Sequence, residues 1–215
     1  MAPGLKKLQA RFYETGAGRK PVKEWLLSLP KVDRRVLGKD IQKVEFGWPI
    51  GMPYCRSLGH GLWEVRSDLT GGTIARVVFC IVGGEMVLLH GFVKKTQRTP
   101  PREIRAFAQT QTGVGLMERK KRKGRVAKDE TFDEFLAREG MLAEAEELAL
   151  KEIIADQIRE AKKERRLTKT EMAARMKTDR RQLDRLLDPK NPSVTLSTLR
   201  RAAFAVGRSL RVELV

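Results

Sequence analysis

The sequence predicts an α+β domain over residues 1–116, followed by an all-helical domain over residues 129–215. In the first part, apolar residues pass from helical to strand spacing, with double glycines between the strands. From residue 129 onward the spacing is almost wholly helical. Between the two parts, residues 117–128 hold seven basic residues against one acidic residue, a run that repels itself and predicts a linker.

The first domain is predicted to pack a helical hairpin on a sheet. A candidate strand at Leu8–Glu14 precedes a helix that opens at Pro21, and a second helix follows over Lys31–Phe46. The apolar face of this hairpin needs a sheet to cover it. Three strands separated by Gly71-Gly72 and Gly83-Gly84 are expected to supply it as an antiparallel meander: Gly61–Ser67, Thr73–Val82 and Glu85–Val93. Pro100-Pro101 predicts a last helix.

The second domain is predicted to contain helices and one short terminal strand. Thr168 is expected to cap a helix, with Glu171 completing a capping box, and Thr178 is expected to cap the helix that follows. The expected elements are the helices Phe132–Arg138, Met141–Arg165, Lys169–Met176, Asp179–Leu187 and Leu196–Val206 and the strand Ser209–Val215.

Charge points to a polyanionic partner. The chain of 215 residues has 44 Lys and Arg against 27 Asp and Glu, a formal net charge of +17, which favours nucleic acid. Cys55 and Cys80 lack the spacing of a zinc site or a disulfide framework, so we expect a cytoplasmic protein without metal or cofactor. No apolar run approaches the roughly 20 residues that span a bilayer.

The predicted sheet brings together groups suited to metal-free RNA cleavage. Arg66 and Arg76 can lie side by side on neighbouring strands, where a phosphate would relieve their repulsion; the alternative is that they pair with Glu64 or Asp68. His90 can transfer protons and shares a face with Phe92 and Lys94, although a lone histidine in an apolar run is often a core residue. The predicted catalytic residues are Arg66, Arg76, His90 and Lys94, and the predicted RNA contacts are Phe92 and Lys95.

Three separated segments of the first domain resemble one toxin family. They are Gly61-Leu-Trp-Glu-Val-Arg66, Ala75-Arg76-Val-Val-Phe79 and the run from Leu88 to Pro100. In this order they resemble the phage-derived HigB-like branch of the RelE/ParE toxin superfamily. The resemblance implies an mRNA endonuclease that acts at the ribosome without metal. Some members of the wider superfamily poison gyrase, so that activity is a further alternative.

The segment Thr168–Leu187 resembles the helix-turn-helix of Xre/HigA-type antitoxins. The resemblance implies a homodimer that binds operator DNA. The side chains expected at the DNA are Thr178, Arg180, Arg181, Gln182 and Arg185. An ordinary helical hairpin with a solvated basic face is the alternative, and Asp179 at the start of the second helix does not favour binding to phosphate.

The segment Asp129–Leu150 is a candidate inhibitor of the first domain. It holds eight acidic residues against Arg138 alone, a net charge of −7, beside a first domain with a net charge of +10. Its apolar residues Phe132, Phe135, Leu136 and Leu142 are expected to supply lasting contact on that domain; the alternative is a solvated helix face. Met117 opens the basic linker, which suggests descent from two adjacent genes.

The sequence therefore predicts a toxin–antitoxin module in one chain. Its expected partners are mRNA and the ribosome for the first domain, operator DNA for the second, and each domain for the other within the chain. One rival hypothesis is a transcription regulator whose first domain has lost catalysis. The other is a toxin directed at gyrase.

Overall fold

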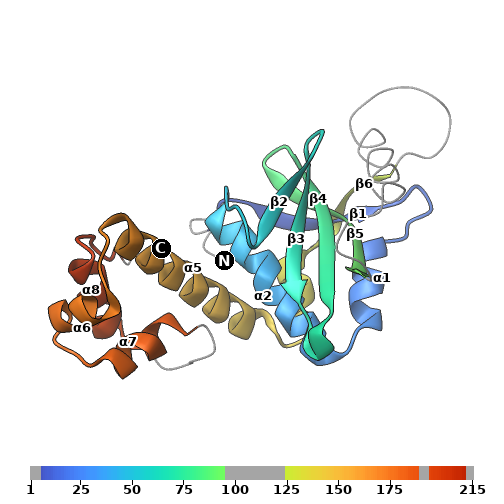
Figure 1. Cartoon of the computed structure of the whole chain (residues 1–215). Helices are drawn as coiled ribbons and strands as arrows, with labels where there is room; N and C mark the ends of the chain where they lie inside the picture. Colours follow the sequence, from blue (N-terminus) through green and yellow to red (C-terminus); the bar gives the residue numbers. More distant parts are fainter. Residues whose placement is uncertain (1–5, 95–123, 189–193, 212–215) are drawn as a thin grey trace. The chain divides into compact units, whose positions relative to one another are not determined.

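The computed structural model describes residues 6–94, 124–188 and 194–211 (Figure 1). It divides the chain into two compact units, one covering Leu5–Glu146 and the other beginning at Glu147. We call them the sheet unit and the helical unit. No helix in the described residues is both long enough and apolar enough to span a membrane.

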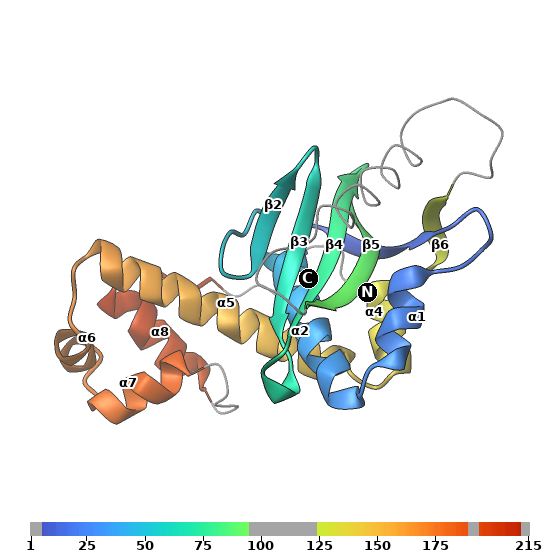
Figure 2. The ribbon, with the colours of Figure 1, turned by 45° about the vertical axis from the view of Figure 1, so that its right-hand side comes forward.

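A six-stranded mixed sheet forms the centre of the sheet unit, in the order β2-β3-β4-β5-β1-β6. The strands β2 to β5 are antiparallel neighbours, β1 runs parallel to β5, and β6 runs antiparallel to β1 (Figure 2). The strands are β1 (Gln9–Glu14), β2 (Cys55–Gly59), β3 (Leu62–Asp68), β4 (Ile74–Val82), β5 (Glu85–Lys94) and β6 (Arg125–Thr131).

The structure confirms the meander of β3, β4 and β5 and corrects the prediction of a purely antiparallel sheet. Strand β1 pairs with β5 in parallel register, from Gln9 opposite Glu85 to Phe12 opposite Leu88. Parallel neighbours need a long crossover. Here the crossover contains helices α1 (Pro21–Ser28) and α2 (Lys31–Gly47) and the meander that follows them. The predicted helix after Pro100 lies outside the described residues.

Helices α1 and α2 cover one face of the sheet. Val22 and Leu26 of α1 and Leu37 and Ile41 of α2 are fully buried, in the same cluster as the sheet residue Phe79. Trp25 of α1 lies so close to Gly91 of β5 that a Cβ at this position would meet the indole at 2.0 Å. A glycine at this point of β5 is therefore what allows α1 to pack directly on the strand.

Residues 125–146 are part of the sheet unit, which places the boundary between the units after Glu146 and not near residue 117. Residues 125–128, expected in the linker, begin β6, and Arg125 and Val126 pair with Glu14 and Tyr13 of β1. Helix α4 (Phe132–Arg138) then sets Phe132 and Phe135 edge-on to Phe12, at ring centroid distances of 5.9 and 5.5 Å. The reason for the difference is burial, because these two rings are at most 1% exposed and join the main core.

Ion pairs tie the acidic residues of this segment to the first part of the chain. Each pair sets a Lys or Arg from the first 35 residues against an Asp or Glu from residues 129–146. The pairs are Lys6–Asp133 (2.5 Å), Lys6–Glu146 (3.5 Å), Lys20–Asp129, Lys23–Glu130 (2.6 Å), Arg34–Glu139 (2.7 Å) and Arg35–Glu144 (3.3 Å). The opposite charges therefore set the position of the segment, while the aromatic rings fill the core.

The Lys6–Asp133 pair belongs to a mostly buried polar network. Gln42 donates to Asp133 Oδ1 at 2.6 Å, and Lys6 Nζ also lies 3.6 Å from Glu45 Oε2. Burial raises the pKa of Glu45 to about 8, despite the nearby charge of Lys6. The backbone N–H of Ala10 donates to Glu45 Oε1 at 2.7 Å, so this carboxyl also fixes the start of β1.

The helical unit packs four helices around a small core. Helix α5 (Leu142–Glu164) continues from the sheet unit into this unit, and α6 (Lys169–Arg175), α7 (Arg180–Leu187) and α8 (Leu196–Ala205) follow. The core of the unit contains Ile158, Met172, Met176, Leu183 and Ala202. Of the expected terminal strand, residues 209–211 are not in a strand and the remainder lies outside the described residues.

The helix caps partly match the prediction. The capping box of Thr168 and Glu171 at α6 is confirmed. The prediction that Thr178 caps α7 is wrong, because Asp179 is the capping residue and its side chain accepts from the backbone N–H of Gln182 at 2.7 Å. Asp179 also interacts favourably with the dipole of α7. Its role as a cap therefore explains why an acidic residue stands at the start of a helix expected to bind DNA.

The first prediction concerns the aromatic contact of α4. Replacing Phe132 by Ala should lower the free energy of unfolding of the sheet unit by about 3–5 kcal/mol, because a fully buried ring leaves a cavity beside Phe12. Urea unfolding of the full chain measures this change. Leu27→Ala on α1 is the control, since Leu27 is 46% exposed and should change stability by less than about 1 kcal/mol. Equal effects of the two changes would show that α4 is only loosely attached.

Candidate functional site

Cationic side chains gather on the face of the sheet opposite α1 and α2. The apolar residues Val65, Val77 and Phe79 point toward the helices, so the alternate residues of β3 and β4 point away from them. Arg66 of β3 and Arg76 of β4 are among these alternate residues. We call Arg56, Arg66, Arg76 and Lys94 the cationic cluster.

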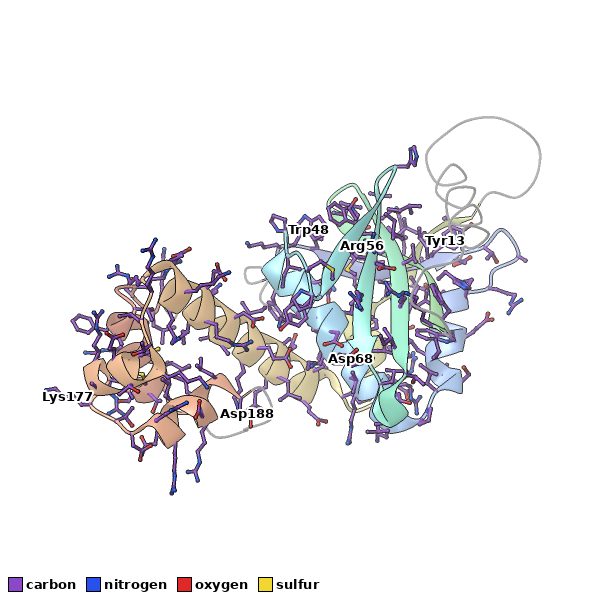
Figure 3. All side chains as sticks on the ribbon, viewed as in Figure 1. Tyr13, Trp48, Arg56, Asp68, Lys177 and Asp188 are labelled. Carbon is purple, nitrogen blue, oxygen red and sulfur yellow. The ribbon has the colours of Figure 1, made fainter. Side chains whose placement is uncertain are left out.

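Strand register aligns the cluster in rows across the sheet. Arg66 lies opposite Arg76, and Arg76 lies opposite Phe92 of β5. In the neighbouring row Arg56 of β2 lies opposite Glu64. Figure 3 shows Arg56 on β2. Opposed residues in a sheet have their Cβ atoms about 5 Å apart, so these side chains share one small area.

A bulge in β5 determines where His90 points. Phe79 pairs with Leu88, but the next residue of β4, Val78, pairs with His90, so Leu89 is the extra residue. Without this extra residue His90 would share the helix-covered face with Leu88. His90, Phe92 and Lys94 share one face, as predicted, because they alternate along β5, and the rings of His90 and Phe92 lie 5.8 Å apart. The bulge determines that this shared face is the cationic one.

Buried Arg76 is held by the carboxylate of Glu64. The two side chains form an ion pair, with exposures of 4% and 0%. Desolvation lowers the pKa of Arg76, and the nearby charge of Arg56 lowers it further. One alternative weighed for the arginines, pairing with Glu64, is therefore realised at Arg76. Its Nε atom is buried and has no hydrogen-bond partner among the described residues, so this donor of the guanidinium is unsatisfied.

Lys94 is affected by the whole cluster. Desolvation lowers its pKa first, and the charges of Arg76, Arg66 and Arg56 lower it further. Like charges this close favour an anion that can lie among them. A phosphate group has the charge and the acceptor oxygens to do so.

The structure brings together most of the residues predicted for RNA chemistry. Arg66, Arg76, His90, Phe92 and Lys94 lie on one face of three adjacent strands. Lys95 lies outside the described residues. Sequence reasoning missed Arg56, because β2 has the short, mostly polar sequence Cys-Arg-Ser-Leu-Gly and was not predicted as a strand. The signal that could have found β2 is the turn at His60-Gly61 before a predicted strand, where both residues adopt positive φ.

The residues predicted at DNA lie in the helical unit. Arg180, Arg181, Gln182 and Arg185 are exposed on α7, while Leu183 and Leu186 face its core. Thr178 precedes the helix, and its hydroxyl donates to the side-chain oxygen of Gln182 at 2.6 Å. This contact leaves the amide N–H groups of Gln182 as the available donors.

No group of three or more His, Cys, Asp or Glu residues in the described part of the chain is arranged to hold a metal ion.

Comparison with known proteins finds one family for the first half of the chain. Residues 24–111 match the model of the family described as phage derived protein Gp49-like (DUF891). The match begins in α1 and includes every residue of the cationic cluster. No curated protein and no solved structure matches the chain. The predicted resemblance is thus supported at the level of a phage-derived family, over residues that end before β6.

The second prediction concerns the buried pair beneath the cluster. Glu64→Gln and Arg76→Met should each destabilise the sheet unit by about 3 kcal/mol, because each leaves one polar or charged partner buried without compensation. The double variant Glu64→Gln/Arg76→Met should lose clearly less than the sum of the two single changes. Urea unfolding of the full chain gives all three values. Strict additivity would mean that the two groups do not interact.

Proposed function

We propose that the sheet unit binds and cleaves RNA, and that the chain joins this toxin-like domain to a DNA-binding regulator. The observation that carries the proposal is the cationic cluster beside His90 and Phe92 on one face of the sheet. The match to a phage-derived family over residues 24–111 supports a toxin-like domain. The net charge of +17 is consistent with polyanionic partners.

The proposed reaction is attack of a ribose 2′-hydroxyl on the adjacent phosphate. The 2′-oxygen loses its proton and bonds to phosphorus, and the 5′-oxygen leaves with a proton. We assign the phosphate contacts to Arg56, Arg66 and Lys94, because guanidinium and ammonium groups stabilise the charge that gathers on the phosphorane. His90 is assigned to proton transfer. Phe92, next to it, offers a ring on which an unstacked base can lie.

Arg76 has a different proposed role. Its pairing with buried Glu64 neutralises much of its charge, so it is assigned to positioning Arg66 and Phe92, its neighbours in register. The same pairing favours the second candidate function, a transcription regulator whose sheet unit no longer catalyses. In that case the cluster would bind an anion without turning it over.

The acidic segment is not placed to mask the cationic cluster directly. Its ion pairs with the first part of the chain use Lys6, Lys20, Lys23, Arg34 and Arg35, and none of the described pairs reaches a member of the cluster. Its aromatic residues pack on the core side of the sheet. We propose that the segment restrains the domain by fixing β1, the neighbour of β5, which carries His90, Phe92 and Lys94. Inhibition of toxicity by this segment would then be indirect.

We propose that α6, the following turn and α7 form a helix-turn-helix that binds operator DNA as a homodimer. The exposed face of α7 presents Arg180, Arg181, Gln182 and Arg185, which are side-chain types that contact base edges and phosphates. The Thr178–Gln182 contact supports this assignment because it orients an amide donor before DNA binds. Operator binding by the fused chain would let it control its own transcription.

The third prediction tests RNA cleavage. Arg56→Ala and Arg66→Ala should each lower the rate of mRNA cleavage in a reconstituted translation system by about 100-fold, because each removes a charge that stabilises the transition state. The reaction is followed with the full chain and with a fragment ending at Glu146, which keeps the whole core of the sheet unit. Arg19→Ala is the control, since Arg19 is 72% exposed and, among the described residues, forms its ion pair with nearby Glu24.

Unchanged cleavage in both folded variants would exclude the cluster as the catalytic site. Absence of cleavage by the unmodified chain and fragment, with RNA binding retained, would support the non-catalytic regulator. Accumulation of cleaved DNA in cells without loss of mRNA would identify gyrase as the target.

The fourth prediction tests DNA reading by α7. Arg181→Ala or Gln182→Ala should weaken binding to a duplex selected from a random pool by about 1–3 kcal/mol and relax its sequence preference. Lys163→Ala on α5 should have little effect, because Lys163 is 81% exposed on a different helix. Uniform weakening on every duplex would assign Arg181 and Gln182 to phosphates. Salt-independent binding, or none, would remove the regulator from the proposal.

A further inference from the structure

A second cationic surface in the helical unit surrounds an apolar cavity. The cavity has a volume of about 520 Å³ and lies between the end of α6, helix α8 and the residues that follow α8. Among the described residues, its lining combines apolar and basic side chains with Ser209 and contains no acidic one: Arg175, Met176, Lys177, Arg200, Arg201, Phe204, Arg208, Ser209 and Leu210. No residue of α7 takes part, so this surface is separate from the proposed DNA-reading helix. Figure 3 labels Lys177 in the turn after α6.

An aromatic ring stands open to solvent at this cavity. Phe204 is 80% exposed, the largest exposure among the large apolar residues described. It follows Arg200 by four residues and Arg201 by three, so the ring and both guanidinium groups lie along one side of α8. Covering an exposed phenylalanine ring with a binding partner would lower the free energy, because apolar surface would be removed from water.

Two of the arginines are held in place beside the ring. Arg175 donates to the carbonyl of Ala205 at 3.3 Å, and Arg208 donates to Glu164 at 2.9 Å. These contacts fix Arg175 and Arg208 in the wall of the cavity. Arg200, Arg201 and Lys177, which also line it, are the cations left to meet an anion that carries an apolar or aromatic group.

We propose that this surface binds single-stranded nucleic acid, with a base stacked on Phe204 and its phosphates among Arg200, Arg201 and Lys177. Alternating phosphates and flat bases match a rim of cations around one aromatic ring. Duplex DNA does not suit it, because its bases are stacked inside the helix and cannot reach the ring. A second copy of the chain does not suit it either, because a two-fold contact would set these cations against themselves.

The inference goes beyond the proposed function, which assigns RNA to the sheet and duplex DNA to α7. A single strand of nucleic acid bound at the α8 cavity would stay attached to the protein independently of the sheet and of α7. Because the site uses the backbone charge and the face of any base, we expect it to accept RNA and DNA with little sequence preference.

The test measures binding of fluorescent oligo(dT) of twelve nucleotides to the full chain by anisotropy. It uses an Arg56→Ala/Arg66→Ala background so that the sheet contributes little. In that background Phe204→Ala should raise the Kd about tenfold, because stacking on one ring is lost. Leu196→Ala is the matched control, since Leu196 is 59% exposed on the same helix but does not line the cavity, and its Kd should be unchanged.

Arg201→Ala should also raise the Kd and should reduce the salt dependence of binding by about one phosphate contact, whereas Arg181→Ala on α7 should leave oligo(dT) binding unchanged. Equal binding by the Phe204→Ala variant and its parent would overturn the proposal. So would displacement of oligo(dT) by polyglutamate at equal charge concentration, which would indicate an acidic protein. A dimer of the parent that becomes a monomer on Phe204→Ala, seen by sedimentation, would assign the surface to self-association and overturn it as well.

Discussion

The packing of Phe132 and Phe135 against Phe12 determines how this chain is organised. It attaches residues from beyond position 124 to the first strand of the chain, and so makes β6 and α4 part of the same core as α1, α2 and the meander. Aromatic pairs in this geometry add specific contact energy to the burial of their area. The ion pairs around these rings help to fix the position of the segment along the first part of the chain. Lys6, which pairs with the segment, also lies beside buried Glu45, whose pKa is about 8 and whose side chain accepts a hydrogen bond from the start of β1. The division of the protein into units therefore follows burial and not the basic run in the sequence.

The sequence predicted what depends on local pattern. Helices α1 and α2 could be located because Pro21 marks the start of the first, Pro30 marks its end, and apolar residues recur at helical spacing; α4 was predicted over the same residues, Phe132–Arg138. The meander of β3, β4 and β5 could be predicted because Gly71-Gly72 and Gly83-Gly84 provide positive φ at its turns. What was missed depends on contacts between distant residues. The parallel pairing of β1 with β5 and the addition of β6 to the sheet cannot be recognised from a local sequence pattern. Both join strands that are far apart in the sequence, so they depend on which sheet edges are unpaired.

The candidate site shows the same division at the scale of side chains. That Arg66 and Arg76 are neighbours follows from counting residues through the turn between two strands. The count does not predict which arginine pairs with Glu64. Glu64, Arg66 and Arg76 all lie on the same face, so either arginine could have formed the ion pair, and the structure shows that Arg76 does. The bulge at Leu89 and the position of Arg56 beside β3 also depend on packing and were not predicted from the sequence. The proposed roles differ accordingly, with Arg56, Arg66 and Lys94 at the phosphate and Arg76 behind them.

The position of the acidic segment constrains how such a chain could be controlled. An inhibitor that covers a catalytic face can be removed without loss of the fold, because the face existed before it was covered. Here Phe132, Phe135 and Leu136 are at most 1% exposed within the main core, so removing them uncovers the interior of the domain. Loss of the segment would then weaken the cationic cluster's scaffold instead of simply exposing it. The segment pairs with β1, and β1 pairs with β5, which carries His90, Phe92 and Lys94, so the strands connect the segment to the cluster by direct pairing. A change in the segment can therefore influence the cluster by moving these two strands.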